Sequence, residues 1–186
     1  WSARYRKART HGVRHGTGSF EKVMAWLDEH QPHDVGNCLI HNDFRFDNLV
    51  LAHDDPTRVI GVLDWEMATL GDPLMDLGGA LAYWVQADDD RIMRGSRRQP
   101  THAPGMLTRD EVWQYYAHAS GRAISPKDQL FYEIFGLFRL AVIAQQIYYR
   151  YANGQTSNPA FKQFRGMVIY LEWRCRRLMR RAGRLS

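Results

Sequence analysis

The sequence predicts an α+β domain that is mostly helical and carries a small β-hairpin region with a polar loop. Short β-rich runs separated by polar turns are confined to residues 37–63. From residue 73 onwards, longer apolar segments follow helix-start signals. The 186 residues, of which 45% are hydrophobic, are enough to bury one core, and we expect residues 1–186 to form a single unit.

The first thirty residues are expected to be helical. Residues 21–27 form an apolar-periodic segment, and Ser19 is placed to cap the helix that they predict. The segment His15–Phe20 contains a Gly-x-Gly motif. Since no strand precedes this motif, we interpret it as a loop and not as a phosphate cradle.

The β region consists of three short apolar runs. These are Asn37–Ile40, Leu49–Leu51 and Val59–Leu63, and the polar turn His53–Thr57 separates the last two. The polar loop lies between the first two runs, and Asp64 follows the third. The polar side chains therefore lie in a loop or at a strand end, where a rigid scaffold can present them to a ligand.

The remainder is predicted to be helical, with one interruption. Pro73 begins an apolar-rich helix that runs to Val85. Residues 86–107 are polar, include the acidic triplet Asp88–Asp90, which we interpret as solvated, and are expected to form a long loop that serves as a substrate-side insert or a lid. Later helices are marked by a capping box at Thr108–Glu111 with an end near Gly121, and by starts at Ser125-Pro126 and Asn158-Pro159.

The polar loop carries the strongest functional signal. Asp43 and Asn48 are five residues apart. Asp64 directly follows the third apolar run, Val59–Leu63. Protein kinases use the same order: a catalytic-loop Asp, an Asn five residues later, and a metal-binding Asp after a further strand. A hairpin with solvated acidic residues would explain one such Asp. Three matching residues at this spacing favour phosphoryl transfer.

The motifs His41–Leu49 and Val62–Leu77 resemble the aminoglycoside phosphotransferase family of kinase-like enzymes, and most closely its branch found fused to acyl-CoA dehydrogenases. Choline kinases carry a similar His-Asn-Asp motif. The resemblance implies the fold of a protein-kinase-like C-terminal lobe. Its specific motifs cover residues 39–78 only.

The resemblance also implies roles for single residues. Asp43 would be the catalytic base, and Asn48 and Asp64 would bind Mg²⁺ and, through it, the ATP phosphates. His41 would brace the loop, and Asp76 would be a structural hydrogen-bond acceptor behind it.

Three further residues in the motifs have open roles. Arg45 either neutralises developing phosphoryl charge or pairs with an acid in a structural role, and the structural role is favoured. Glu66 either contacts the substrate or metal-bound water, or braces a loop. Asp47 is expected to shape the loop and not to act as a second base.

These assignments predict an enzyme that transfers the γ-phosphoryl group of ATP to a hydroxyl of a small molecule, with Mg²⁺ as cofactor. Members of the resembled family act on antibiotics, amino alcohols, sugars and hydroxyacyl thioesters. Two alternatives stay open: a catalytically inactive kinase-like binding module, and a metal-dependent phosphate hydrolase that activates water.

Other parts of a kinase-like ATP site are not found in the sequence. These are a glycine-rich strand-turn-strand, a strand lysine and a helix glutamate. The chain begins at Trp1 in residues that already look helical. We therefore expect the chain to be a C-terminal lobe whose partner is a nucleotide-binding N-terminal lobe of the same protein. We expect the C-terminal lobe alone to be inactive.

Composition narrows the class of protein. The net charge of +5 comes largely from arginines near the two ends, and no nucleic-acid reader motif accompanies them, so a solvated helix face is favoured over nucleic-acid binding. No membrane span is expected, because charged residues interrupt the longest apolar segment, residues 130–147.

Two isolated cysteines, with Cys38 expected in the core, favour a reducing cytoplasm. The helical aromatics are expected to be core and not a cage for a choline-type cation.

Overall fold

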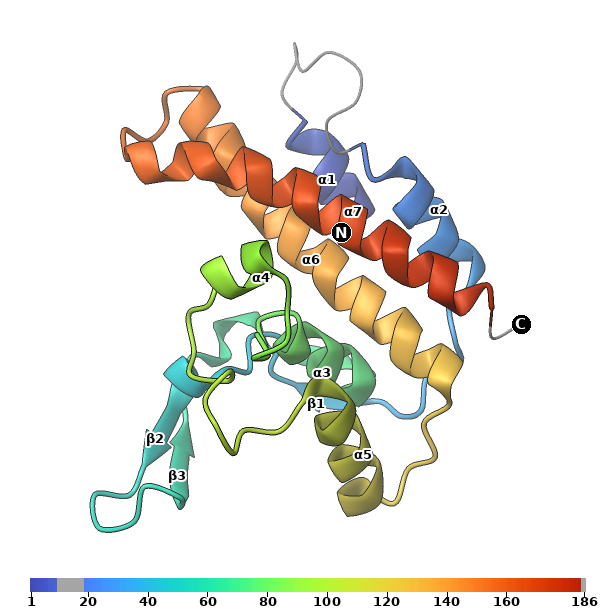
Figure 1. The fold of residues 1–186 in the computed structure, drawn as a ribbon, viewed down its shortest axis with the longest axis vertical. Coiled ribbons are helices and arrows are strands. Elements are labelled where there is room, and N and C mark those ends of the chain that lie inside the picture. The colour runs from blue at the N-terminus through green and yellow to red at the C-terminus, as the bar shows by residue number, and fades with distance from the viewer. Residues whose placement is uncertain (10–18, 185–186) are drawn as a thin grey trace. The chain divides into compact units, whose positions relative to one another are not determined.

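A computed structural model describes residues 1–9 and 19–184 (Figure 1). The Gly-x-Gly motif at residues 16–18 lies outside the described residues. The chain divides into two compact units: Trp1–Pro32 with Ile134–Ser186, and His33–Glu133.

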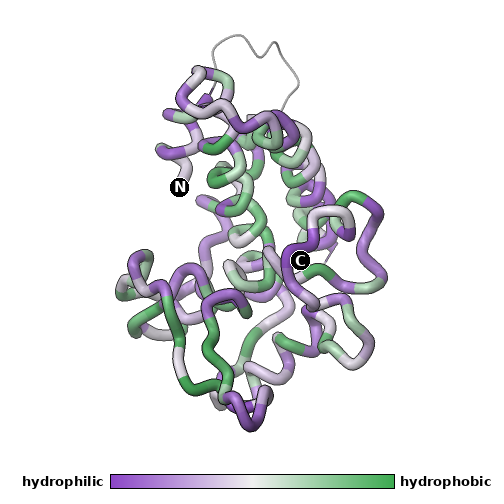
Figure 2. Tube along the Cα trace, turned by 90° about the vertical axis from the view of Figure 1, so that its left-hand side faces the viewer, coloured by the Kyte–Doolittle hydropathy of each residue, from purple (hydrophilic) through white to green (hydrophobic). Residues whose placement is uncertain are grey.

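The first unit is helical. It contains α1 (Ser2–Lys7), α2 (Glu21–Glu29), the larger part of α6 (Pro126–Ala152), a 3₁₀ segment η3 (Pro159–Gln163) and α7 (Phe164–Ala182). Hydrophobic and hydrophilic residues both occur along the helical part of the chain (Figure 2).

The core of the first unit centres on three aromatic rings. The Tyr5 ring centroid lies 5.2 Å from that of Phe20, and the Phe20 centroid lies 5.5 Å from that of Phe138. Phe20 is fully buried and adopts a left-handed conformation (φ 50°) as the residue before α2. The prediction that Ser19 caps this helix is therefore wrong, because burial of the Phe20 ring fixes the helix start instead.

Helix α6 is long and apolar enough to cross a membrane by length and composition, which the sequence had not indicated. Of its most apolar 18-residue window, 67% is buried inside the structure. The core helix of a globular protein passes the same test, so this feature is weak evidence for a membrane.

The second unit holds four short strands in two antiparallel pairs. β1 (Cys38–Ile40) pairs with β4 (Thr69–Gly71), and β2 (Leu49–Leu51) pairs with β3 (Val59–Val62). β2 and β3 form a hairpin that projects from the unit (Figure 1). Strand β4 was not predicted, because Thr69-Leu70-Gly71 holds a single apolar residue and ends in glycine, so it is not a β-rich run like those of β1–β3.

Helices α3 (Pro73–Leu81), α4 (Arg91–Gly95) and α5 (Arg109–Ser120) complete the second unit. The capping box at Thr108 and Glu111 is confirmed, and α5 ends at Gly121 with φ 65°. The helix from Pro73 is shorter than predicted, because the backbone of Val85 is hydrogen-bonded to the Thr101 hydroxyl and not to a further helical turn.

Three local predictions in this unit are wrong. Residues 86–107 are not a plain loop, because Asp90 caps α4 by accepting hydrogen bonds from two backbone N–H groups. Asp89 is buried and paired with Arg109, so the acidic triplet is not simply solvated. Cys38 is exposed and not a core residue, whereas Cys175 is buried.

Candidate functional site

The polar loop, residues 41–48, connects β1 to β2 and ends in a single 3₁₀ turn, η1 (Phe46–Asn48). Asp64 lies after β3. In the β2·β3 pairing Leu49 is opposite Val62, and the backbone N–H of Leu63 donates to the Asn48 carbonyl at 2.8 Å. Asn48 and Asp64 therefore flank the same end of this two-stranded ladder.

Asp76, in the first turn of α3, holds the start of the loop. Its Oδ2 accepts the backbone N–H of His41 at 2.7 Å, and its Oδ1 accepts that of Asn42 at 2.8 Å. Asn42 has φ 65°, and its side-chain amide donates to the Met67 carbonyl at 3.1 Å. A charged acceptor for two adjacent N–H groups strongly fixes a turn, because such hydrogen bonds are stronger than neutral ones.

The His41 ring connects the two acidic segments. The ring is buried, with Nε2 2.7 Å from the Leu63 carbonyl oxygen, and Nδ1 3.2 Å from the backbone nitrogen of Asp43. Since the Asp43 N–H must donate, Nδ1 is the acceptor and Nε2 carries the proton; this tautomer follows from the hydrogen-bond network. The Trp65 ring centroid lies 4.7 Å from that of His41 and covers it. His41 thus fixes both the loop and the residue before Asp64.

Asp43 and Asn48 lie side by side. The Asn48 side-chain nitrogen donates to the Asp43 carbonyl at 2.7 Å and lies 3.4 Å from Asp43 Oδ2. Asn48 is buried, with 7% of its surface exposed, so this orientation is held. Because the amide nitrogen faces Asp43, Oδ1 is the atom of Asn48 that can bind a cation.

Arg45 contacts the same carboxylate oxygen of Asp43 as Asn48 does. One guanidinium nitrogen is 3.3 Å from Asp43 Oδ2, and another is 3.8 Å from the more exposed Asp47 carboxylate. The guanidinium also stacks over the Tyr83 ring at 5.2 Å from its centroid. Arg45 is therefore held by three groups and places a positive charge next to the Asp43 carboxylate.

Asp64 and Glu66 are exposed. Asp64 adopts a left-handed conformation (φ 66°, ψ 51°), which is strained for a residue other than glycine and is often found at functional sites. Glu66 lies two residues later in the 3₁₀ turn η2 (Trp65–Met67). Within residues 1–9 and 19–184, neither carboxylate has a hydrogen bond or an ion pair.

The donors at this site suit Mg²⁺ held together with phosphate. In the part of the chain that the structure describes, no group of three or more His, Cys, Asp or Glu side chains could hold a metal by itself. Mg²⁺ in nucleotide enzymes commonly takes one or two protein oxygens and completes its shell with phosphates and water. The amide oxygen of Asn48 and the carboxylate of Asp64 are such ligands.

Sequence reasoning missed two contacts with the loop. The backbone N–H of Phe46 donates to Gln99 Oε1 at 2.8 Å, and the Phe46 ring packs edge-on against Trp84 with centroids 5.4 Å apart. The segment around Gln99 has no motif, so no sequence signal could have identified this residue.

Comparison with known proteins decides the family. Residues 1–112, more than half of the chain, match the model of the phosphotransferase enzyme family. The chain belongs to this family. Its fold is the kinase-like aminoglycoside phosphotransferase fold, as predicted.

The relatives place the chain in a fusion-type branch of the family. It is 37% identical to mouse acyl-CoA dehydrogenase family member 10 over 165 residues, covering 88% of the chain and 15% of that protein. It is 34% identical to human acyl-CoA dehydrogenase family member 11, covering 90% of the chain and 21% of that protein. The chain thus spans about a fifth or less of the length of these relatives.

A solved structure supports the fold assignment. The crystal structure described as "a putative aminoglycoside phosphotransferase" from Ralstonia eutropha JMP134 aligns with a TM-score of 0.72 and 30% sequence identity. The alignment covers 94% of this chain and 53% of that one.

Proposed function

We propose that this phosphotransferase moves the γ-phosphoryl group of ATP to a hydroxyl of a small molecule, with Asp43 as the catalytic base. The observation that carries the proposal is the braced loop. Asp76 and His41 fix the backbone of residues 41–43, Asn48 lies against the Asp43 carboxylate, and Asp64 lies at the same ladder end as Asn48.

Asp43 is suited to orient an acceptor hydroxyl. Its side chain is 22% exposed, and Arg45 and Asn48 both contact Oδ2, so Oδ1 is the oxygen available to a ligand. The carboxylate would accept the hydrogen bond of the hydroxyl and take its proton as the new bond forms. Most of the rate enhancement in such sites comes from positioning and from neutralising charge.

Asn48 and Asp64 are the residues we propose to hold Mg²⁺. When bound, the ion would neutralise charge on the ATP phosphates. Asn48 is oriented for this role by its bonds to Asp43, which engage its amide nitrogen and leave Oδ1 as the ligand atom. Asp64 is exposed, and no partner among the described residues competes for its oxygens.

Arg45 and Glu66 complete the proposed site. Arg45 keeps the Asp43 carboxylate oriented through its 3.3 Å ion pair, and we propose that its positive charge neutralises charge that develops on the transferred group. Glu66 is exposed on the same segment as Asp64, and we propose it as a substrate contact.

We also propose that a nucleotide-gripping lobe of the same protein completes the ATP site. Among the described residues, the four strands form no glycine-rich strand-turn-strand, and the turn between β2 and β3 contains no glycine. For this reason every activity assay below uses the full-length natural polypeptide.

The acceptor is best sought with a screen of hydroxylated metabolites that reads ADP release. Because relatives are named as acyl-CoA dehydrogenases, hydroxyacyl thioesters come first, followed by amino alcohols, sugars and aminoglycosides. Phosphate release without any acceptor would instead indicate a hydrolase. Calorimetric binding of Mg-ATP without turnover on any acceptor would indicate an inactive binding module.

Substitutions test the assigned roles. We expect Asp43→Ala to lower turnover by about 10²-fold or more while nucleotide binding is retained. Asp64→Ala should also weaken Mg²⁺-dependent nucleotide binding, measured by calorimetry. Asp54→Ala is the matched control, since Asp54 is an exposed acid of the turn between β2 and β3 and lies outside the loop, and it should keep turnover near wild type. Wild-type turnover by Asp43→Ala would refute the base assignment.

A further inference from the structure

The segment after α3 contacts the polar loop through one buried side chain. Gln99 lies in the polar stretch between α4 and α5, and only 6% of its surface is exposed. Its Oε1 accepts the backbone N–H of Phe46 at 2.8 Å, across 53 positions of sequence. A buried polar side chain directed at one backbone group of a functional loop needs an explanation.

The explanation starts from the 3₁₀ turn that carries Asn48. The first N–H groups of a helical turn have no partner within the turn and are commonly bonded by the side chain of the preceding residue. That residue here is Arg45, whose guanidinium has only N–H donors and so cannot accept a bond from the turn. Gln99 supplies the missing acceptor. It therefore acts as a distant cap of the turn that presents Asn48.

Two further contacts come from the same segment. Trp84 packs against the Phe46 ring, and Tyr83 lies under the Arg45 guanidinium. Arg45 and Phe46 are thus both contacted by residues 83–99, which we call the brace segment. Arg45 thus contacts the brace segment directly, and Asn48 is connected to it through Phe46, the first residue of its 3₁₀ turn.

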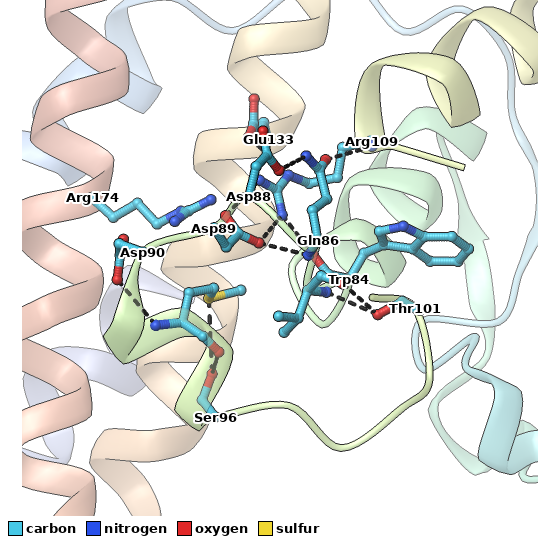
Figure 3. Close-up of polar contacts among 12 residues, drawn as sticks. Trp84, Gln86, Asp88, Asp89, Asp90, Ser96, Thr101, Arg109, Glu133 and Arg174 are labelled. Atoms are coloured by element: carbon cyan, nitrogen blue, oxygen red, sulfur yellow. Dashed lines mark hydrogen bonds and ion pairs between the residues drawn. The ribbon is translucent and has the colours of Figure 1, made fainter. Parts of the chain in front are cut away.

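The brace segment is held by polar contacts of its own (Figure 3). Arg109 forms two hydrogen bonds of 2.8 Å with the carboxylate of buried Asp89 and a third, of 2.6 Å, with the Trp84 carbonyl. Thr101, two residues beyond Gln99, exchanges two hydrogen bonds with the backbone of Val85. Buried, paired charges and satisfied backbone groups are features of a fixed support and not of a lid that opens.

We propose that Gln99 is a positioning residue of the phosphoryl-transfer site, which rests on the function proposed above. Its bond to Phe46 sets the position of the 3₁₀ turn, and through Asn48 and Arg45 it sets the carboxylate of Asp43. Gln99 touches neither substrate nor metal in this scheme. Its removal should misplace the reacting groups without removing any of them.

The test compares two glutamines with similar bonds. Gln99→Met keeps the length of the side chain and fills its space but removes the amide oxygen. Gln145→Met is the matched control, because Gln145 is also buried and donates to the Ala8 carbonyl at 2.8 Å within the first unit. Gln99→Glu restores an acceptor oxygen at the same length.

We expect Gln99→Met to lower kcat by about ten- to a hundredfold while KM for Mg-ATP and acceptor stays near wild type. Gln99→Glu should recover much of this loss, and Gln145→Met should leave kcat unchanged even if it lowers Tm. In hydrogen-exchange mass spectrometry, peptides covering residues 44–49 should exchange about tenfold faster in Gln99→Met.

Either of two results would overturn the proposal: wild-type kcat and exchange in Gln99→Met, or an equal loss of kcat in Gln145→Met. Failure of the proposed function would look different. The wild-type protein would then transfer phosphate to no acceptor, while faster exchange at residues 44–49 in Gln99→Met would still show that Gln99 holds the loop.

Discussion

Removing the Asp76 carboxylate should destabilise the second unit and its polar loop more than almost any other single substitution. The two oxygens accept the backbone N–H groups of His41 and Asn42 at 2.7 and 2.8 Å. The His41 N–H belongs to a residue that is only 3% exposed, so water cannot replace the lost acceptor. Each hydrogen bond to a charged group contributes about 1.5–3 kcal/mol. Asp76→Ala should therefore lower the free energy of unfolding by about 3–5 kcal/mol.

Asp76→Asn provides the graded comparison. It keeps one acceptor oxygen but directs an amide N–H₂ towards the second backbone N–H, so about half of the loss is expected. Asp28→Ala, at an exposed position of α2, is the control and should change the free energy of unfolding by less than about 0.5 kcal/mol.

The assay is urea unfolding followed by tryptophan fluorescence, with midpoints and slopes compared across the three variants. A loss below about 1 kcal/mol in Asp76→Ala, comparable to an average substitution, would refute the reasoning that this carboxylate holds the loop.

Further predictions concern packing and pH. A Cβ at Gly78 would clash with the Tyr132 carbonyl oxygen, so Gly78→Ala should lower the free energy of unfolding by about 1–3 kcal/mol. Gly166 has open space around it, so Gly166→Ala should raise the free energy of unfolding by up to about 1 kcal/mol. Chemical denaturation distinguishes the two outcomes. Burial, followed by the nearby charge of Glu172, raises the pKa of Tyr5 well above its ordinary value. Above about pH 10 the unfolded chain ionises this tyrosine and the folded chain does not, so its contribution to stability is complete below pH 10 and declines by about 1.4 kcal/mol per pH unit above it. Tyr5→Phe should flatten the fall in stability between pH 10 and 12, and an unchanged slope would contradict this account.

Sequence reasoning found the parts of the site that are encoded locally. The spacing of Asp43, Asn48 and Asp64 places them around one loop and one strand end, and short β-rich runs with polar turns are enough to predict β1, β2 and β3. The capping box before α5 could also be predicted, because its two residues, Thr108 and Glu111, lie three positions apart.

Contacts that form only in the folded chain could not be predicted from the sequence. Gln99 reaches Phe46 across 53 positions, and no periodicity marks such a pair. Strand β4 exists because β1 lies beside it, and Phe20 begins α2 because its ring is buried. In each case tertiary packing overrides a weak local preference.

The central claim is that the side chains of Asp43, Asn48 and Asp64 form one phosphoryl-transfer site. A crystal structure of the full-length protein with Mg²⁺ and a non-hydrolysable ATP analogue tests it most directly. We predict an ion about 2.0–2.1 Å from Asn48 Oδ1 and from an Asp64 oxygen, with the γ-phosphate facing Asp43. A nucleotide and metal bound elsewhere, with these three side chains in contact with neither, would contradict the claim.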